Sequence, residues 1–128
     1  MFLSIGVLCL AIAGCTGGGG APPDPNKPMY GLYSGKLGAW TVPDSQFYQQ
    51  TISIRLTEYK VSVWIKDVEF PARLLEINPT KVRFTFRMIN ECEYECSAVR
   101  TGSELKGTFE CLTDRQEKVA IGAFVVTK

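Results

Sequence analysis

The chain has 128 residues, with 14 basic and 13 acidic side chains, no histidine and a formal net charge of +1. A charge this close to balance argues against a dedicated nucleic-acid-binding protein, which would carry a strong basic excess. The lack of histidine excludes Ser-His-Asp and Cys-His catalysis within this chain, together with most zinc hydrolase sites.

Residues 1–14 form an almost wholly apolar segment. This segment suits the hydrophobic region of a signal peptide but is too short to span a bilayer as a stable helix, so we expect it to be removed. It leads into Ile12-Ala13-Gly14-Cys15, which resembles the lipobox of bacterial lipoprotein precursors. The resemblance implies that the Cys15 thiol is lipidated and that Cys15 becomes the mature amino terminus.

The leader departs from that family in one respect, since no Lys or Arg precedes Lys27. Either the natural start codon lies upstream or the leader is atypical. The alternatives to a lipoprotein are an ordinary secretory signal with a chance cysteine and a retained membrane anchor. Thr16 stands where an Asp would favour the inner membrane, so the resemblance implies the outer membrane or the cell surface of a bacterial envelope.

Residues 15–29 follow the leader and contain four glycines and four prolines. This composition cannot bury a core and shows no periodicity. We therefore expect a flexible linker between the lipidated cysteine and a single folded domain at 30–128.

The apolar residues of that domain alternate with polar ones, which predicts strands. The pattern indicates an all-β fold of eight antiparallel strands in an up-and-down meander, from a first strand at about Tyr30 to Trp40 to a last one at Val119 to Thr127. Such a meander commonly closes into a barrel, because closure removes both exposed edges. The last strand is apolar on both faces, and we expect its outer side to be covered by a loop that carries Trp40, Val42, Phe47 and Tyr48.

Short turns predict the register of neighbouring strands. A turn at 58–59 places Ile54 opposite Val63, and a turn at 67–68 places Val63 opposite Ala72. In the next strand the alternation changes phase, which predicts a bulge near 74–75. A turn with proline in its second position follows at 78–81.

Three cysteines, Cys92, Cys96 and Cys111, fall within the domain. A loop at 89–91 places Phe84 opposite Cys96, and a turn at 101–102 places Cys92 directly opposite Cys111. We therefore predict a Cys92–Cys111 disulfide and a buried free thiol at Cys96, as an oxidising compartment permits. The alternatives are a Cys96–Cys111 disulfide and a metal site of three thiolates without a histidine.

Gly38-Ala39-Trp40 at the start of the meander resembles the Gly-x-Trp opening of lipocalins, and the fold is similar to small calycin-type barrels. The later Thr-Asp-Tyr element of that family appears only as Thr113-Asp114-Arg115. The resemblance implies a barrel and, as an alternative function, a carrier of a small apolar ligand. Its cavity would be lined by Phe84, Phe86, Tyr94 and Phe109.

Many of the inward positions are large, so a small eight-stranded barrel would be nearly filled. We therefore expect a membrane-tethered structural or protein-interaction module that is not an enzyme and needs no cofactor or metal. Its partners would be the membrane, through Cys15, and another envelope protein. The outward acidic residues predict a solvated face rather than a glycosidase cleft; they are Glu93, Glu95, Glu104 and Glu110.

Outward positions of the earlier strands predict a contact surface that consists of Trp64, Arg55, Arg73 and Arg83. Trp64 is expected next to Ser53 and Pro71. The basic residues along these strands would suit an anionic lipid or glycan, whereas an ordinary solvated surface with weak cross-strand ion pairs is the alternative. One such pair is expected between Arg87 and Glu93.

Overall fold

The computed structural model describes residues 23–42, 44–88 and 92–128. The predicted signal peptide, the lipidation residue Cys15 and most of the predicted linker lie outside the described residues. Within the described residues, no helix has the length and apolar character that crossing a membrane requires.

The described chain contains one turn of 3-10 helix followed by nine strands. Their bounds are η1 (Lys27–Met29), β1 (Gly31–Thr41), β2 (Phe47–Leu56), β3 (Val61–Ile65), β4 (Val68–Phe70), β5 (Ala72–Ile77), β6 (Lys81–Arg87), β7 (Glu93–Thr101), β8 (Glu104–Leu112) and β9 (Lys118–Thr127).

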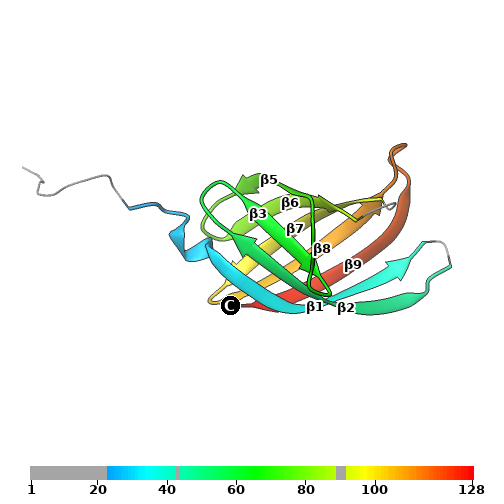
Figure 1. Cartoon of the computed structure of the whole chain (residues 1–128), viewed down its shortest axis with the longest axis horizontal. Coiled ribbons are helices and arrows are strands. Elements are labelled where there is room, and N and C mark those ends of the chain that lie inside the picture. The colour runs from blue at the N-terminus through cyan, green and yellow to red at the C-terminus, as the bar shows by residue number, and fades with distance from the viewer. Residues whose placement is uncertain (1–22, 43, 89–91) are drawn as a thin grey trace, which may run out of the picture.

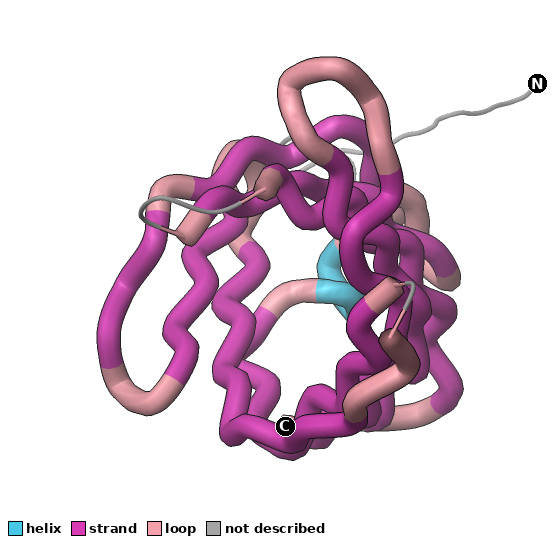
Figure 2. The backbone as a smooth tube through the Cα atoms, turned by 90° about the vertical axis from the view of Figure 1, so that its right-hand side faces the viewer, coloured by secondary structure: helices cyan, strands magenta, loops and turns pink. Residues whose placement is uncertain are grey.

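The strands form one antiparallel sheet in the order β4-β3-β2-β1-β9-β8-β7-β6-β5. The first and last strands pair, with Ser34 opposite Thr127 and Trp40 opposite Ile121. This pairing curls the sheet into a nearly closed barrel (Figure 1), and a view along the barrel shows the strands as a ring (Figure 2). The predicted all-β antiparallel barrel is therefore confirmed.

The predicted count of eight strands is wrong, because Pro71 divides the fourth strand into β4 and β5. Proline has no N–H to donate to a ladder, so pairing stops there. β4 pairs with β3, and β5 pairs with β6. Among the described residues no ladder joins β3 to β5, although the two strands lie close together. We refer to this gap between β3 and β5 as the seam.

Two predicted hairpins have the expected register. Ile54 lies opposite Val63 in β2 and β3, and Phe84 lies opposite Cys96 in β6 and β7. The predicted bulge is also confirmed, because the β5–β6 register shifts between Leu74 and Glu76.

Two other predicted registers are wrong by two residues. Val63 lies opposite Phe70 rather than Ala72, because the turn after β3 is made by Lys66 and Asp67, both with positive φ. Mirror-image turns of this kind match the twist of a hairpin.

The hairpin of β7 and β8 shows the same error. Ala98 lies opposite Gly107 rather than Leu105, and Tyr94 rather than Cys92 lies opposite Cys111. Here the turn is made by Gly102, with a φ of 62°, and Ser103. A shift of two residues keeps every side chain on its predicted face.

The up-and-down path gives the barrel two distinct ends (Figure 1). We call one the η1 end; it contains η1, the C-terminal residue Lys128 and the turns that follow β2, β5 and β7. We call the other the disulfide end; it contains the connections that follow β1, β3, β6 and β8.

The turn η1 lies across one opening of the barrel (Figure 2). Met29 is fully buried, and its carbonyl oxygen accepts a hydrogen bond of 2.8 Å from the Tyr33 hydroxyl. The Lys128 ammonium donates to the carbonyl oxygens of Pro28 and Tyr30, at 2.8 and 3.0 Å. The last residues of the predicted linker therefore pack onto the barrel.

Candidate functional site

Two large aromatic side chains lie exposed on the outer face of β1 and β2. Trp40 and Phe47 are ladder partners with ring centroids 4.7 Å apart, and 48% and 51% of their surface is accessible. Trp40 also lies opposite Ile121 of β9, which is 40% exposed. Three large apolar side chains are thus adjacent on the surface at the disulfide end.

A groove of about 520 Å³ lies beside these side chains, and we call it the Trp40 groove. Its apolar lining consists of Gly38, Trp40, Phe47, Phe109, Ile121, Gly122 and Ala123. Gly38 and Ala123 lie opposite each other, so small residues form the floor of this part of the groove. A Cβ atom on Gly38 would lie 3.0 Å from the Phe47 ring, which shows that the ring covers the glycine.

A charged pair borders the Trp40 groove. The Lys118 ammonium lies 2.9 Å from a carboxylate oxygen of Glu110, and both residues line the groove. The site therefore has an apolar, aromatic centre and a polar edge. Protein–protein interfaces commonly combine these two features.

The sequence pattern predicted part of this site. Trp40 and Phe47 were expected near the outer side of the last strand, and the structure places Trp40 opposite Ile121. The expectation that they belong to a covering loop is wrong, because both are strand residues. The alternation that turns Ala39 inward also turns Trp40 outward, and that was the signal of an exposed aromatic pair.

The predicted contact surface is only partly assembled. The Arg55 guanidinium lies 6.0 Å from the centre of the Trp64 ring, a distance that permits a cation–π interaction. Trp64 lies opposite Ser53, as predicted, but its other neighbour is Glu69 rather than Pro71. The two-residue error in the β3–β4 register accounts for that difference.

The other two members of that predicted surface lie on β5 and β6. Arg83 forms an ion pair of 3.4 Å with Glu76, and Arg73 lies opposite Thr85. The seam separates these strands from the β3 strand that carries Trp64. The Trp40 groove, rather than this surface, is the more complete apolar site.

The four residues of the predicted ligand cavity are all buried in the barrel. Phe86 stacks on Tyr94 with ring centroids 4.6 Å apart, and Tyr94 contacts Phe109 at 5.3 Å. Phe84 contacts Phe124 at 6.2 Å. These rings pack against one another, so a ligand at this place would have to displace them; the carrier function stays a prediction.

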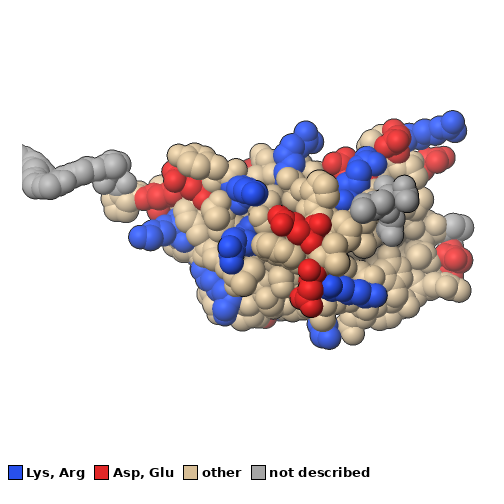
Figure 3. Space-filling view, viewed as in Figure 1, with Lys and Arg blue, Asp and Glu red and all other residues tan. Residues whose placement is uncertain are grey.

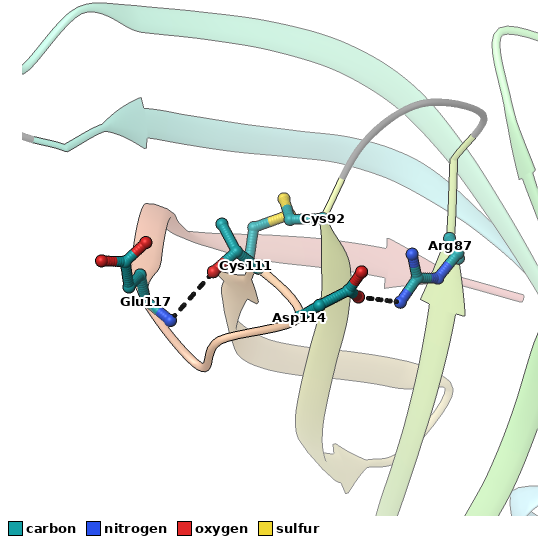
Figure 4. Close-up of polar contacts among 6 residues, drawn as sticks. Arg87, Cys92, Cys111, Asp114 and Glu117 are labelled. Atoms are coloured by element: carbon teal, nitrogen blue, oxygen red, sulfur yellow. Dashed lines mark hydrogen bonds and ion pairs between the residues drawn. A yellow bond between two sulfur atoms is a disulfide. The ribbon is translucent and has the colours of Figure 1, made fainter.

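The predicted Cys92–Cys111 disulfide is present at the disulfide end (Figure 4). Beside it, the Arg87 guanidinium lies 3.3 Å from a carboxylate oxygen of Asp114. Arg87 does lie opposite Glu93, as predicted, but its ion pair is with Asp114.

Cys96 is a free, buried thiol, as predicted. Its burial raises the pKa of the thiol, and the negative charge of Glu95 adds to the effect. The thiol is therefore protonated at neutral pH and is not a ready nucleophile. Within the described ranges, no group of three or more Cys, Asp or Glu side chains is placed to hold a metal ion.

No family model, curated protein or solved structure matches this chain. The resemblances to lipoproteins and lipocalins are therefore those of the quoted sequence motifs alone.

Proposed function

We propose that this chain is a lipid-anchored protein of the bacterial cell envelope that binds another protein through the Trp40 groove and catalyses no reaction. The observation that carries the proposal is the exposed contact between Trp40 and Phe47. Aromatic residues supply much of the binding energy in protein interfaces, because they bury a large area and lose little conformational entropy.

The shape of the groove supports a protein partner. The Phe47 ring lies over Gly38, and Ala123 contributes only a methyl group, so the groove keeps room beside Phe47 and Ile121 for a protruding apolar side chain of the partner. The Glu110–Lys118 pair at the edge offers both a carboxylate and an ammonium to polar groups of the partner. Such a rim contributes specificity more than affinity.

The anchoring part of the proposal is supported by the sequence Ile12-Ala13-Gly14-Cys15, followed by glycines and prolines. Mass spectrometry of the protein purified from bacterial membranes tests it. We expect a mature chain that begins at Cys15 and carries acyl chains. A chain that starts elsewhere, or that carries no lipid, contradicts the anchoring.

The binding part can be tested in cells with a photo-crosslinking amino acid in place of Phe47. We expect a specific crosslinked partner that is lost when Trp40→Ala is added. The matched control has the crosslinker in place of Thr51, an exposed residue of the same strand nearer the η1 end. Equal capture at both positions, or capture that survives Trp40→Ala, contradicts the proposed site.

A further inference from the structure

Charge is unevenly distributed along the barrel axis. Each end is taken to comprise its turns and terminal segments together with the three residues of each strand that lie nearest to that end, with β4 and β5 taken as one strand. The η1 end has eight basic residues, namely Lys27, Arg55, Lys60, Lys81, Arg83, Arg100, Lys106 and Lys128, and four acidic ones, namely Asp24, Glu58, Glu76 and Glu104. The disulfide end has the opposite balance.

At the disulfide end, the same count of described residues gives four basic residues, namely Lys66, Arg87, Arg115 and Lys118, against eight acidic ones, namely Asp44, Asp67, Glu69, Glu93, Glu95, Glu110, Asp114 and Glu117. Although the net charge is only +1, the charge is therefore strongly asymmetric along the barrel axis, with a basic excess at the η1 end and an acidic excess at the disulfide end. On the face drawn in Figure 3, several basic side chains lie near the point where the described chain begins, with acidic side chains among them.

The η1 end also exposes apolar and aromatic surface. Tyr59, in the turn after β2, is 85% exposed beside Lys60, and Leu32 is 45% exposed. A second groove, of about 540 Å³, is lined by Tyr30, Leu32 and Arg55, among others. Exposed Tyr and Leu side chains among Lys and Arg are typical of surfaces that bind the interface of a membrane.

The position of Cys15 limits how far the η1 end can lie from a lipid anchor. Pro23, where the described chain begins, lies eight Cα–Cα steps after Cys15, and these steps span at most about 29 Å even when fully extended. The chain enters the barrel through η1. A lipid on Cys15 would therefore keep the η1 end within about 29 Å of the bilayer.

We propose that the η1 end of the barrel rests on an anionic lipid bilayer, with Lys27 and Lys60 near the headgroups and Tyr59 at the interface. The orientation in cells rests on the proposed lipid anchor, whereas the affinity of this end for anionic lipid does not. In this orientation the Trp40 groove and the acidic disulfide end point away from the membrane, where a partner can reach them.

The test uses the chain from residue 15 with Cys15→Ser, which contains every described residue and no lipid. Sedimentation with vesicles of phosphatidylglycerol and phosphatidylcholine is compared with phosphatidylcholine alone. We expect binding only to the anionic vesicles and a loss of binding at high salt, because salt screens the attraction. Lys27→Glu with Lys60→Glu should lower the partition coefficient at least about tenfold, since each basic residue near the surface contributes to binding.

The matched control is Lys66→Glu with Arg115→Glu, which changes the net charge equally at the disulfide end. Both pairs of residues are exposed, so both variants should melt as the parent does. We expect the control to lose less than about twofold in binding. Equal losses in the two variants, or no preference of the parent for anionic vesicles, overturn the inference.

Failure of the lipid anchor would give a different result. The membrane-purified protein would then have the mass of a chain without acyl groups, whereas the vesicle binding of the Cys15→Ser chain would be unchanged. Failure of the docking surface would leave the lipid on Cys15 and remove the vesicle binding. The two proposals can therefore fail separately.

Discussion

Cys92 and Cys111 are joined by a disulfide although they are not ladder partners, and their Cα atoms lie 5.4 Å apart. Cys111 lies opposite Tyr94, and the β8–β9 register shifts directly after Cys111. The bond therefore ties the residue that precedes β7 to an irregular point of β8. It closes a covalent loop that contains β7 and all of β8 up to Cys111.

Removal of this bond should destabilise the barrel. A disulfide across a sequence separation of 19 restricts the unfolded chain, and a loop of that size is worth about 3 kcal/mol. We expect Cys92→Ser with Cys111→Ser to lower the free energy of unfolding in urea by about 2–4 kcal/mol. Reductant should lower the stability of the parent by a similar amount and leave the double variant unchanged; a reductant effect on the variant would contradict this assignment.

Alkaline pH should destabilise the protein through Cys96. Burial raises the pKa of this thiol above the ordinary value of 9.0, so the unfolded chain ionises first as the pH rises. The stability is fully present below pH 9.0 and falls above it, by up to about 1.4 kcal/mol per pH unit. Urea unfolding on either side of that pH should show a smaller decline in Cys96→Ala than in the parent. Equal declines in the two proteins would show that Cys96 does not cause the effect.

Gly35 should tolerate no side chain. A Cβ atom there would overlap the carbonyl oxygen of Val125 and lie 2.9 Å from the Cα atom of Val126, both of which are backbone atoms of the neighbouring strand. We expect Gly35→Ala to cost about 3 kcal/mol of unfolding free energy, or to prevent folding.

The control for that substitution is Gly102→Ala. Gly102 has a φ of 62° and no atom within 4 Å of an added Cβ, so the expected cost is only the backbone strain, about 1 kcal/mol. Thermal melts of the two variants measure the difference. A smaller cost at Gly35 than at Gly102 would mean that β1 and β9 can separate slightly at this pair.

Acid should loosen the segment around η1. The Tyr30 hydroxyl donates a 2.6 Å hydrogen bond to Asp24, and this bond, followed by the one from the Asn26 amide, lowers the pKa of Asp24 below 3.8. The stabilisation is present above pH 3.8 and is lost as the pH falls through the lowered pKa.

Hydrogen exchange of the Met29 and Tyr30 amides, which bond to Asn26 and Lys27, reports this loosening. We expect their protection to decrease at low pH in the parent and to be already reduced at neutral pH in Asp24→Asn. Amides in the middle of β8 serve as the internal control and should not change. Full protection in Asp24→Asn would show that the hydrogen bond is not needed to hold η1.

The sequence predicted which face of each strand is buried better than it predicted the pairing. Alternation assigns Val63 and Phe70 to the same interior whether Phe70 or Ala72 is the partner, because a shift of two residues leaves both faces unchanged. The register was decided by the turn at Lys66 and Asp67. Both residues have positive φ, which is uncommon for residues other than glycine, so the residue types did not indicate this turn. Pattern alone could therefore not fix these hairpins.

The candidate site was harder to predict for a related reason. The sequence predicted Trp40 only as part of a loop that covers the last strand, and a groove also needs the small pair Gly38 and Ala123 to be neighbours, which depends on the pairing of β1 with β9. The disulfide was predicted correctly from a wrong register. Two cysteines displaced by two residues from direct pairing can still form a bond where the strand is irregular.

Because of Pro71, no ladder of backbone hydrogen bonds crosses the seam between β3 and β5. Every other pair of neighbouring strands in the described chain is joined by a ladder, whereas β3 and β5 lie close together without one. The wall can therefore widen along that line without breaking a ladder. Opening the wall between β1 and β9, which bears the Trp40 groove, would instead break the ladder that joins these two strands.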